Sequence, residues 1–74
     1  MRGSTERQPL LEALGERVRA LRRERGQTLR ELAHRAGLSE RFLSELESGR
    51  ANISVLNLEA VAGALGVQAA SLLA

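Results

Sequence analysis

The chain has 74 residues, a formal net charge of +2 and no cysteine. This length fits one small domain, and the lack of cysteine excludes disulfides and thiolate metal sites. The sequence shows neither an apolar run long enough to cross a bilayer nor a signal-peptide pattern, so we expect a cytoplasmic protein with no membrane partner.

Residues 1–8 are polar and lack hydrophobic periodicity, so we expect a flexible tail before a domain that spans residues 9–74. The first predicted helix covers residues 9–25, because proline is tolerated in a first turn and an apolar stripe follows it. That stripe consists of Leu11, Leu14, Val18 and Leu21. Gly15 lies within the pattern and costs a helix about 1 kcal/mol relative to alanine, which predicts fraying of the first turns.

Residues 28–49 predict two short helices joined by a tight turn. Thr28 can cap the first helix, and Glu31 stands three residues later, as a capping box requires. Gly37 stops that helix, and Ser39 can cap the next one. The inner stripes are Leu29, Leu32, Ala33 and Ala36 in the first helix, and Phe42, Leu43 and Leu46 in the second. Two helices joined by a short, glycine-containing turn form a helix-turn-helix unit.

The rest of the chain predicts two further helices. Ser54 can cap the fourth helix, and Gly66 ends it. Its expected inner face is Val55, Leu58, Val61, Ala62 and Leu65. Residues 68–73 make a final helix of one or two turns, and no strand signal appears. The sequence therefore predicts an all-α domain.

Charge is divided unevenly along the chain. Every arginine lies at or before Arg50, and Glu59 is the only charged residue after it. A basic half followed by an apolar half favours one face for a polyanion and another for packing or a partner. The alternative is a solvated helical surface on which most arginines and glutamates cancel.

The helix-turn-helix segment resembles the DNA-binding unit of the Cro/cI-type phage repressors and of XRE-like bacterial regulators. The matching residues are Leu32-Ala33, Ala36-Gly37-Leu38-Ser39, Leu43-Ser44, Leu46-Glu47 and Gly49. The resemblance covers residues 14–73 and implies a compact, five-helix, lambda-repressor-like fold with the helix-turn-helix at its second and third helices. Residues 47–54, with Leu58-Glu59 after them, also resemble the controller proteins of restriction–modification systems.

The resemblance implies that the third helix, residues 39–48, enters the major groove of DNA by its N-terminal end. Carried over position by position, the base-reading residues are Arg41, Glu40, Ser44 and Glu45. A guanidinium can bond guanine O6 and N7 together, which makes Arg41 the main candidate; alternatively, it pairs with Glu45. The two glutamates can accept from cytosine N4 but are repelled by phosphate, and one of them could instead orient Arg41.

Phosphate contacts are expected at the rims of the unit, where the second helix begins and after the third helix ends. The candidates are Gln27, Thr28, Arg30, Ser39, Arg50 and Asn52. The resemblance also implies an ion pair between Arg22 on the first helix and Glu47 at the end of the third, which would fix the angle between these helices. The alternative is two unrelated surface charges.

We expect a transcriptional regulator that binds double-stranded DNA with a palindromic operator as a homodimer, because repressors place two recognition helices about 34 Å apart. The expected dimer interface lies in the apolar end of the chain. It consists of Val67, Ala69, Leu72 and Leu73. Alternatively, these residues only close the core of the monomer.

Other functions receive little support from the sequence. The chain has no aspartate or cysteine and one histidine, His34, so no catalytic pair, metal site or enzyme is predicted. We expect no cofactor and no small-molecule ligand. The main alternative is an interaction module, in which the same fold binds a protein partner, as in antitoxins and adaptor domains. The chain could also be the DNA-binding fragment of a longer regulator.

Overall fold

The computed structural model describes residues 8–73, which form five α-helices and no strand. The helices are α1 (Pro9–Glu24), α2 (Leu29–Ala36), α3 (Glu40–Glu47), α4 (Val55–Leu65) and α5 (Ala69–Leu73). This architecture confirms the predicted all-α, five-helix fold. Within the described residues, no helix is both long and apolar enough to cross a membrane. The predicted tail lies outside the described residues, except for Gln8.

The starts of α2, α3 and α4 follow hydroxyl caps, as the sequence predicted. Thr28 Oγ1 accepts a hydrogen bond from the amide of Glu31 at 3.0 Å, and the Thr28 amide donates to Glu31 Oε1 at 2.9 Å. Ser39 and Ser54 cap α3 and α4 in the same way, each accepting from the amide three residues later. The turn after α2 passes through Gly37, whose φ of 72° is a left-handed conformation that favours glycine. Short-range chemistry therefore sets the boundaries of the helix-turn-helix.

The core is aliphatic and draws on all five helices. Its buried side chains are Leu14, Val18, Leu32, Ala33, Leu43, Leu46, Leu58, Val61, Ala62, Leu65 and Leu72. Phe42 packs against this cluster and is half-buried. The prediction that Val55 belongs to the inner face of α4 is wrong. Val55 is the first residue of the helix and is exposed, and the first buried residue, Leu58, lies one turn later.

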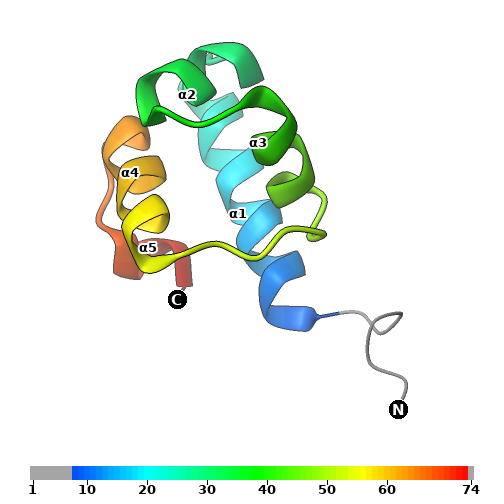
Figure 1. Ribbon diagram of the computed structural model, residues 1–74. Helices are drawn as coiled ribbons and strands as arrows, with labels where there is room; N and C mark the ends of the chain where they lie inside the picture. The colour runs from blue at the N-terminus through cyan, green and yellow to red at the C-terminus, as the bar shows by residue number, and fades with distance from the viewer. Residues whose placement is uncertain (1–7, 74) are drawn as a thin grey trace.

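Packing between helices fixes where the helix-turn-helix sits. The helix pairs in contact include α1 with α3, α2 with α4, and α5 with both α1 and α4 (Figure 1). The small residue Ala33 is buried in α2, which packs against both α3 and α4. Each helix of the unit thus has its inner face held by another part of the domain, while its outer face remains open.

Candidate nucleic-acid interface

The outer face of α3 presents every residue that was predicted to read bases. Glu40, Arg41, Ser44 and Glu45 are all exposed, whereas Leu43 and Leu46 on the opposite face are fully buried. The Arg41 side chain is 90% exposed. The buried leucines hold the helix against the core, so the polar stripe projects from a rigid support.

Two loose ion pairs cover this face. Arg41 Nε lies 3.7 Å from Glu45 Oε2, four residues further along α3. Arg30 Nε, on α2, lies 3.9 Å from Glu40 Oε2 at the start of α3. The alternative interpretation of Arg41, as a partner of Glu45, therefore agrees with the structure. Exposed pairs of this kind contribute only about 0–1 kcal/mol to stability, so either arginine can exchange its carboxylate for another anion or acceptor.

The predicted rim residues are mostly exposed. The exposed set is Thr28, Arg30, Ser39, Arg50 and Asn52. Thr28 and Ser39 use a lone pair of the hydroxyl oxygen for capping, which leaves each hydroxyl hydrogen able to donate to a phosphate oxygen. Asn52 Oδ1 accepts from the Ile53 amide at 2.8 Å, so its side-chain NH₂ remains the group that can donate. These positions flank α3 in the chain on both sides.

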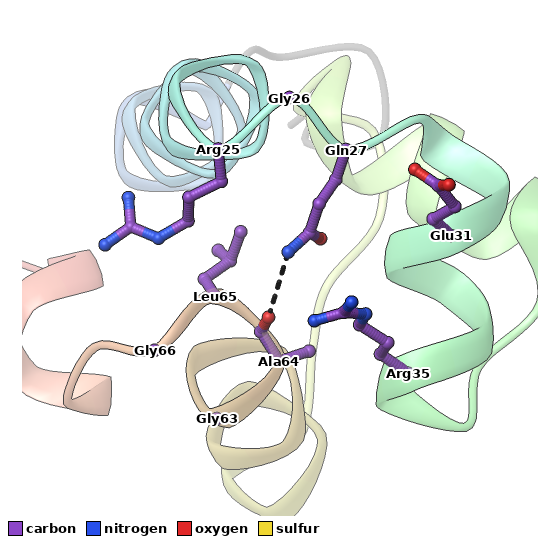
Figure 2. Close-up of a pocket in the computed structure, with 9 residues that line it drawn as sticks. All are labelled: Arg25, Gly26, Gln27, Glu31, Arg35, Gly63, Ala64, Leu65 and Gly66. Atoms are coloured by element: carbon purple, nitrogen blue, oxygen red, sulfur yellow. Dashed lines mark hydrogen bonds between the residues drawn. The ribbon is translucent and has the colours of Figure 1, made fainter.

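Gln27 was predicted to contact the DNA backbone, and the structure corrects this. Its side chain turns inward and Nε2 donates to the carbonyl oxygen of Ala64, near the end of α4, at 3.3 Å (Figure 2). Its Oε1 is buried without a hydrogen-bond partner, and its amide donates to the carbonyl oxygen of Arg22. Gln27 thus joins α1, the loop after it and α4: its amide and one of the two Nε2 hydrogens are used within the domain.

Arg22 and Glu47 form the ion pair that the resemblance implied. Arg22 Nε donates to Glu47 Oε2 at 2.7 Å and Nη2 donates to Oε1 at 3.0 Å, which is a bidentate arrangement. The side chains are only 13% and 8% exposed. Arg22 Nη1 also donates to the carbonyl oxygen of Gln27 at 2.9 Å. The hydrogen bond to Glu47 raises the pKa of the Arg22 guanidinium above its already high value, so the guanidinium stays charged.

Gly15 fixes the same end of α3, a role that sequence reasoning did not assign to it. A Cβ at this position would overlap the carbonyl oxygen of Leu46 and would lie 2.8 Å from that of Glu47. The backbone of α1 therefore touches the last turn of α3 directly. Gly15 lies within an unbroken α1, and its place beside Leu14 on the buried side of the helix is the signal that could have indicated a close approach. Two contacts with α1, one through backbone and one through charge, thus hold the C-terminal end of α3.

The apolar end of the chain divides between core and surface. Leu72 is 2% exposed and closes the core between α5 and the other helices, so we correct its assignment to a dimer interface. Val67 and Ala69 are half-buried against the core, and Leu73 is 49% exposed. Larger apolar exposure occurs where it was not expected, at Val55 (73%) and Leu56 (76%) in the first turn of α4.

Comparisons with known proteins agree with this geometry. Residues 18–72 match the model of the HTH_3 family, described as helix-turn-helix. The chain is 46% identical over 59 residues to the immunity repressor protein of Bacillus phage phi105. This match covers 80% of this chain and 41% of the repressor. The chain therefore spans less than half the length of that relative.

Solved structures have the same fold. The restriction–modification controller protein C.AhdI from Aeromonas hydrophila superposes with a TM-score of 0.82 and 32% identity, over 84% of this chain and 94% of the controller. SinR, a master regulator for biofilm formation, was solved in complex with DNA and superposes with a TM-score of 0.79 and 37% identity, over 82% of this chain and 98% of that chain. The predicted similarity to phage repressors and controller proteins is thus confirmed, and the chain belongs to the HTH_3 helix-turn-helix family.

Proposed function

We propose that this domain is the sequence-specific, double-stranded-DNA-binding part of a transcriptional regulator, with α3 lying in the major groove. The observation that carries the proposal is the exposed polar stripe of α3, with Arg41 at its centre and both ends of the stripe flanked by groups that can donate to phosphate. The likeness to SinR, which was solved in complex with DNA, supports it. The role is non-enzymatic and cytoplasmic and needs no cofactor.

Binding to duplex DNA should depend steeply on salt. Each phosphate that the protein neutralises releases counterions, so the logarithm of the affinity falls with the logarithm of salt concentration by about 0.9 per phosphate. Fluorescence anisotropy with a labelled random-sequence duplex, measured between low and physiological salt, gives this slope. The absence of binding at low salt would refute the proposal and favour the protein-interaction alternative.

Arg41→Ala should lower the affinity for a preferred duplex by about 1–3 kcal/mol and relax the preference at one base pair. The preferred duplex is first recovered by selection from a random pool, which also reports the symmetry and spacing of the site. Arg41→Lys is the matched control, because lysine keeps the charge but loses the planar fork that grips guanine. If the Arg41→Lys variant discriminated bases as well as the native protein does, the guanine contact would be wrong.

We also propose that the regulator is a homodimer that binds a palindromic operator. In Figure 1, α5 returns to the end of the molecule where α4 begins, and these two helices are in contact. The exposed apolar side chains Val55, Leu56 and Leu73 lie on these two helices, in a region of the sequence whose only charge is Glu59. A nearly uncharged apolar surface fits a second copy of the same surface, and Val67 and Ala69 could form its border.

Leu56→Glu should weaken the dimer by roughly 2 kcal/mol or more, because each subunit would bury an unpaired carboxylate. Analytical ultracentrifugation at tens of micromolar measures the effect. Leu10→Glu is the control, because Leu10 is also exposed but lies at the start of α1. Native protein that sediments as a monomer at this concentration would contradict the homodimer.

A protein-interaction role is the second candidate function. It is favoured by the two carboxylates on the outer face of α3, Glu40 and Glu45, which a polyanion does not attract. The similarity to SinR in a complex with the protein SinI, with a TM-score of 0.78 and 38% identity, is compatible with such a role. The salt titration above separates the two candidates, since only a DNA binder responds with the steep slope.

A further inference from the structure

We propose that Glu40 and Glu45 are specificity-determining residues that act by exclusion: they weaken the binding of α3 to random DNA more than its binding to the preferred site. The inference rests on the proposed function and deepens it. It assigns to the two carboxylates a task beyond any favourable contact with a base, namely weakening the binding of this surface to DNA that offers it only phosphate.

The charge balance of α3 is the first observation. The helix holds three glutamates and one arginine. Glu47 is neutralised by Arg22 in a nearly buried bidentate pair. The exposed stripe of α3 itself therefore carries Glu40 and Glu45 against Arg41, so it is negative although the chain as a whole is positive, and the nearest further cation is Arg30 on α2. A negative stripe that approaches a duplex meets repulsion from phosphates on both sides of the groove.

The geometry of the pairs is the second observation. Glu45 Oε2 lies 3.7 Å from Arg41 Nε on the same helix, and Glu40 Oε2 lies 3.9 Å from Arg30 Nε across the turn. The exposed fractions of these four side chains lie between 48% and 90%. Such exposed pairs contribute little to the free energy of folding. The carboxylates do not stabilise the domain in the way that Glu47 does. Their effect is to occupy Arg30 and Arg41, two of the three arginines of α2 and α3, which could otherwise contact the backbone of any duplex.

Only certain base edges can compensate for this arrangement. Guanine O6 and N7 accept from Arg41 in place of Glu45, and the amino groups of cytosine N4 and adenine N6 can donate to a carboxylate. Phosphate offers only acceptors. It can take the place of a glutamate as the partner of Arg30 or Arg41, but it then repels the glutamate that it displaced. A duplex with the right donors in the groove therefore loses less from the two carboxylates than a random duplex does.

The test compares two duplexes with five proteins. The native chain, Glu40→Gln, Glu45→Gln, the double variant Glu40→Gln/Glu45→Gln and the control Glu24→Gln are titrated into the selected duplex and into a random duplex of the same length. Glu24 is a suitable control because it also pairs loosely with an arginine, Arg25, at 3.9 Å, and it lies on the opposite side of α1 from Gly15, which faces α3. Each single substitution changes the net charge by the same amount.

We expect Glu40→Gln and Glu45→Gln each to raise the affinity for random duplex by about 3- to 10-fold, from charge repulsion removed at close range. The affinity for the selected duplex should stay the same or fall, so the ratio of the two affinities falls. Thermal melting checks that every variant is folded. The double variant Glu40→Gln/Glu45→Gln should show the largest loss of discrimination.

Two results would overturn the inference. One is an equal gain in affinity for both duplexes, because the glutamates would then not discriminate between them; a matching gain in Glu24→Gln would show that net charge explains it. The other is no change in the affinity for random duplex in either variant. Failure of the proposed function looks different: the native chain would bind neither duplex at low salt, and no selected site would be recovered.

Discussion

Gly15→Ala should lower the free energy of unfolding by about 2 kcal/mol, although alanine is the better helix former by about 1 kcal/mol. The reason is the direct contact between α1 and α3. The added methyl group would overlap the carbonyl oxygen of Leu46 and would lie 2.9 Å from the carbonyl carbon of Glu47. These are backbone atoms, which cannot rotate away as the end of a flexible side chain can. The two helices must move apart, and the packing around Val18 and Leu46 must open with them.

Gly63→Ala is the matched control for this substitution. Gly63 is also a helical glycine, in α4, but a Cβ there meets nothing within 4 Å. The same chemical change should therefore stabilise the protein by up to about 1 kcal/mol through helix propensity alone. Thermal unfolding followed by circular dichroism should show opposite shifts, with Gly15→Ala lower by roughly 10 °C, since a domain of this size moves about 4–8 °C per kcal/mol. Equal shifts in the two variants would show that α3 does not press on Gly15.

Sequence patterns that act over a few residues predicted the structure correctly. The caps at Thr28, Ser39 and Ser54 and the turn at Gly37 act over three or four residues, and the structure has them where they were expected. The same holds for the exposed stripe of α3, because the periodicity that buries Leu43 and Leu46 leaves Arg41 and its neighbours outside. A pattern that is read along one helix needs no knowledge of the others.

The errors arose where another helix decides the outcome. Gln27 is polar and stands beside a capped helix, so it was assigned to a phosphate, yet α4 offers it the carbonyl oxygen of Ala64. Leu72 was assigned to a partner, yet α5 folds back and buries it. Gly15 was expected to fray α1, whereas it is the point at which α3 rests on that helix. In each case, the deciding neighbour is far away in the sequence.

Breaking the pair of Arg22 and Glu47 should destabilise the domain by about 3 kcal/mol or more, since it leaves one nearly buried charge without its counter-charge. Arg22→Met should cost more than Glu47→Gln. The methionine variant loses the bidentate pair and also the donor that the Gln27 carbonyl oxygen receives at 2.9 Å. Urea unfolding gives both values. A loss of this size is a large part of the roughly 5–15 kcal/mol by which small domains are usually stable.

Glu45→Gln provides the comparison on the same helix. Its pair with Arg41 is looser, at 3.7 Å, and the two side chains are far more exposed than those of Arg22 and Glu47. Removing the charge of Glu45 should change stability by about 0.5 kcal/mol or less. If Glu45→Gln and Glu47→Gln cost the same, the Arg22–Glu47 pair would contribute no more than a surface contact.

The double variant Arg22→Met/Glu47→Leu separates stability from the positioning of α3. Replacing both charges by apolar side chains removes the unpaired charge, and such exchanges of a buried ion pair are often neutral or stabilising. The double variant should therefore recover most of the stability that either single change loses. Its affinity for the selected duplex should remain below the native value, because two apolar side chains lack the bidentate geometry that fixes α3 on α1. Full recovery of both stability and affinity would mean that packing at Gly15 alone sets the angle of α3.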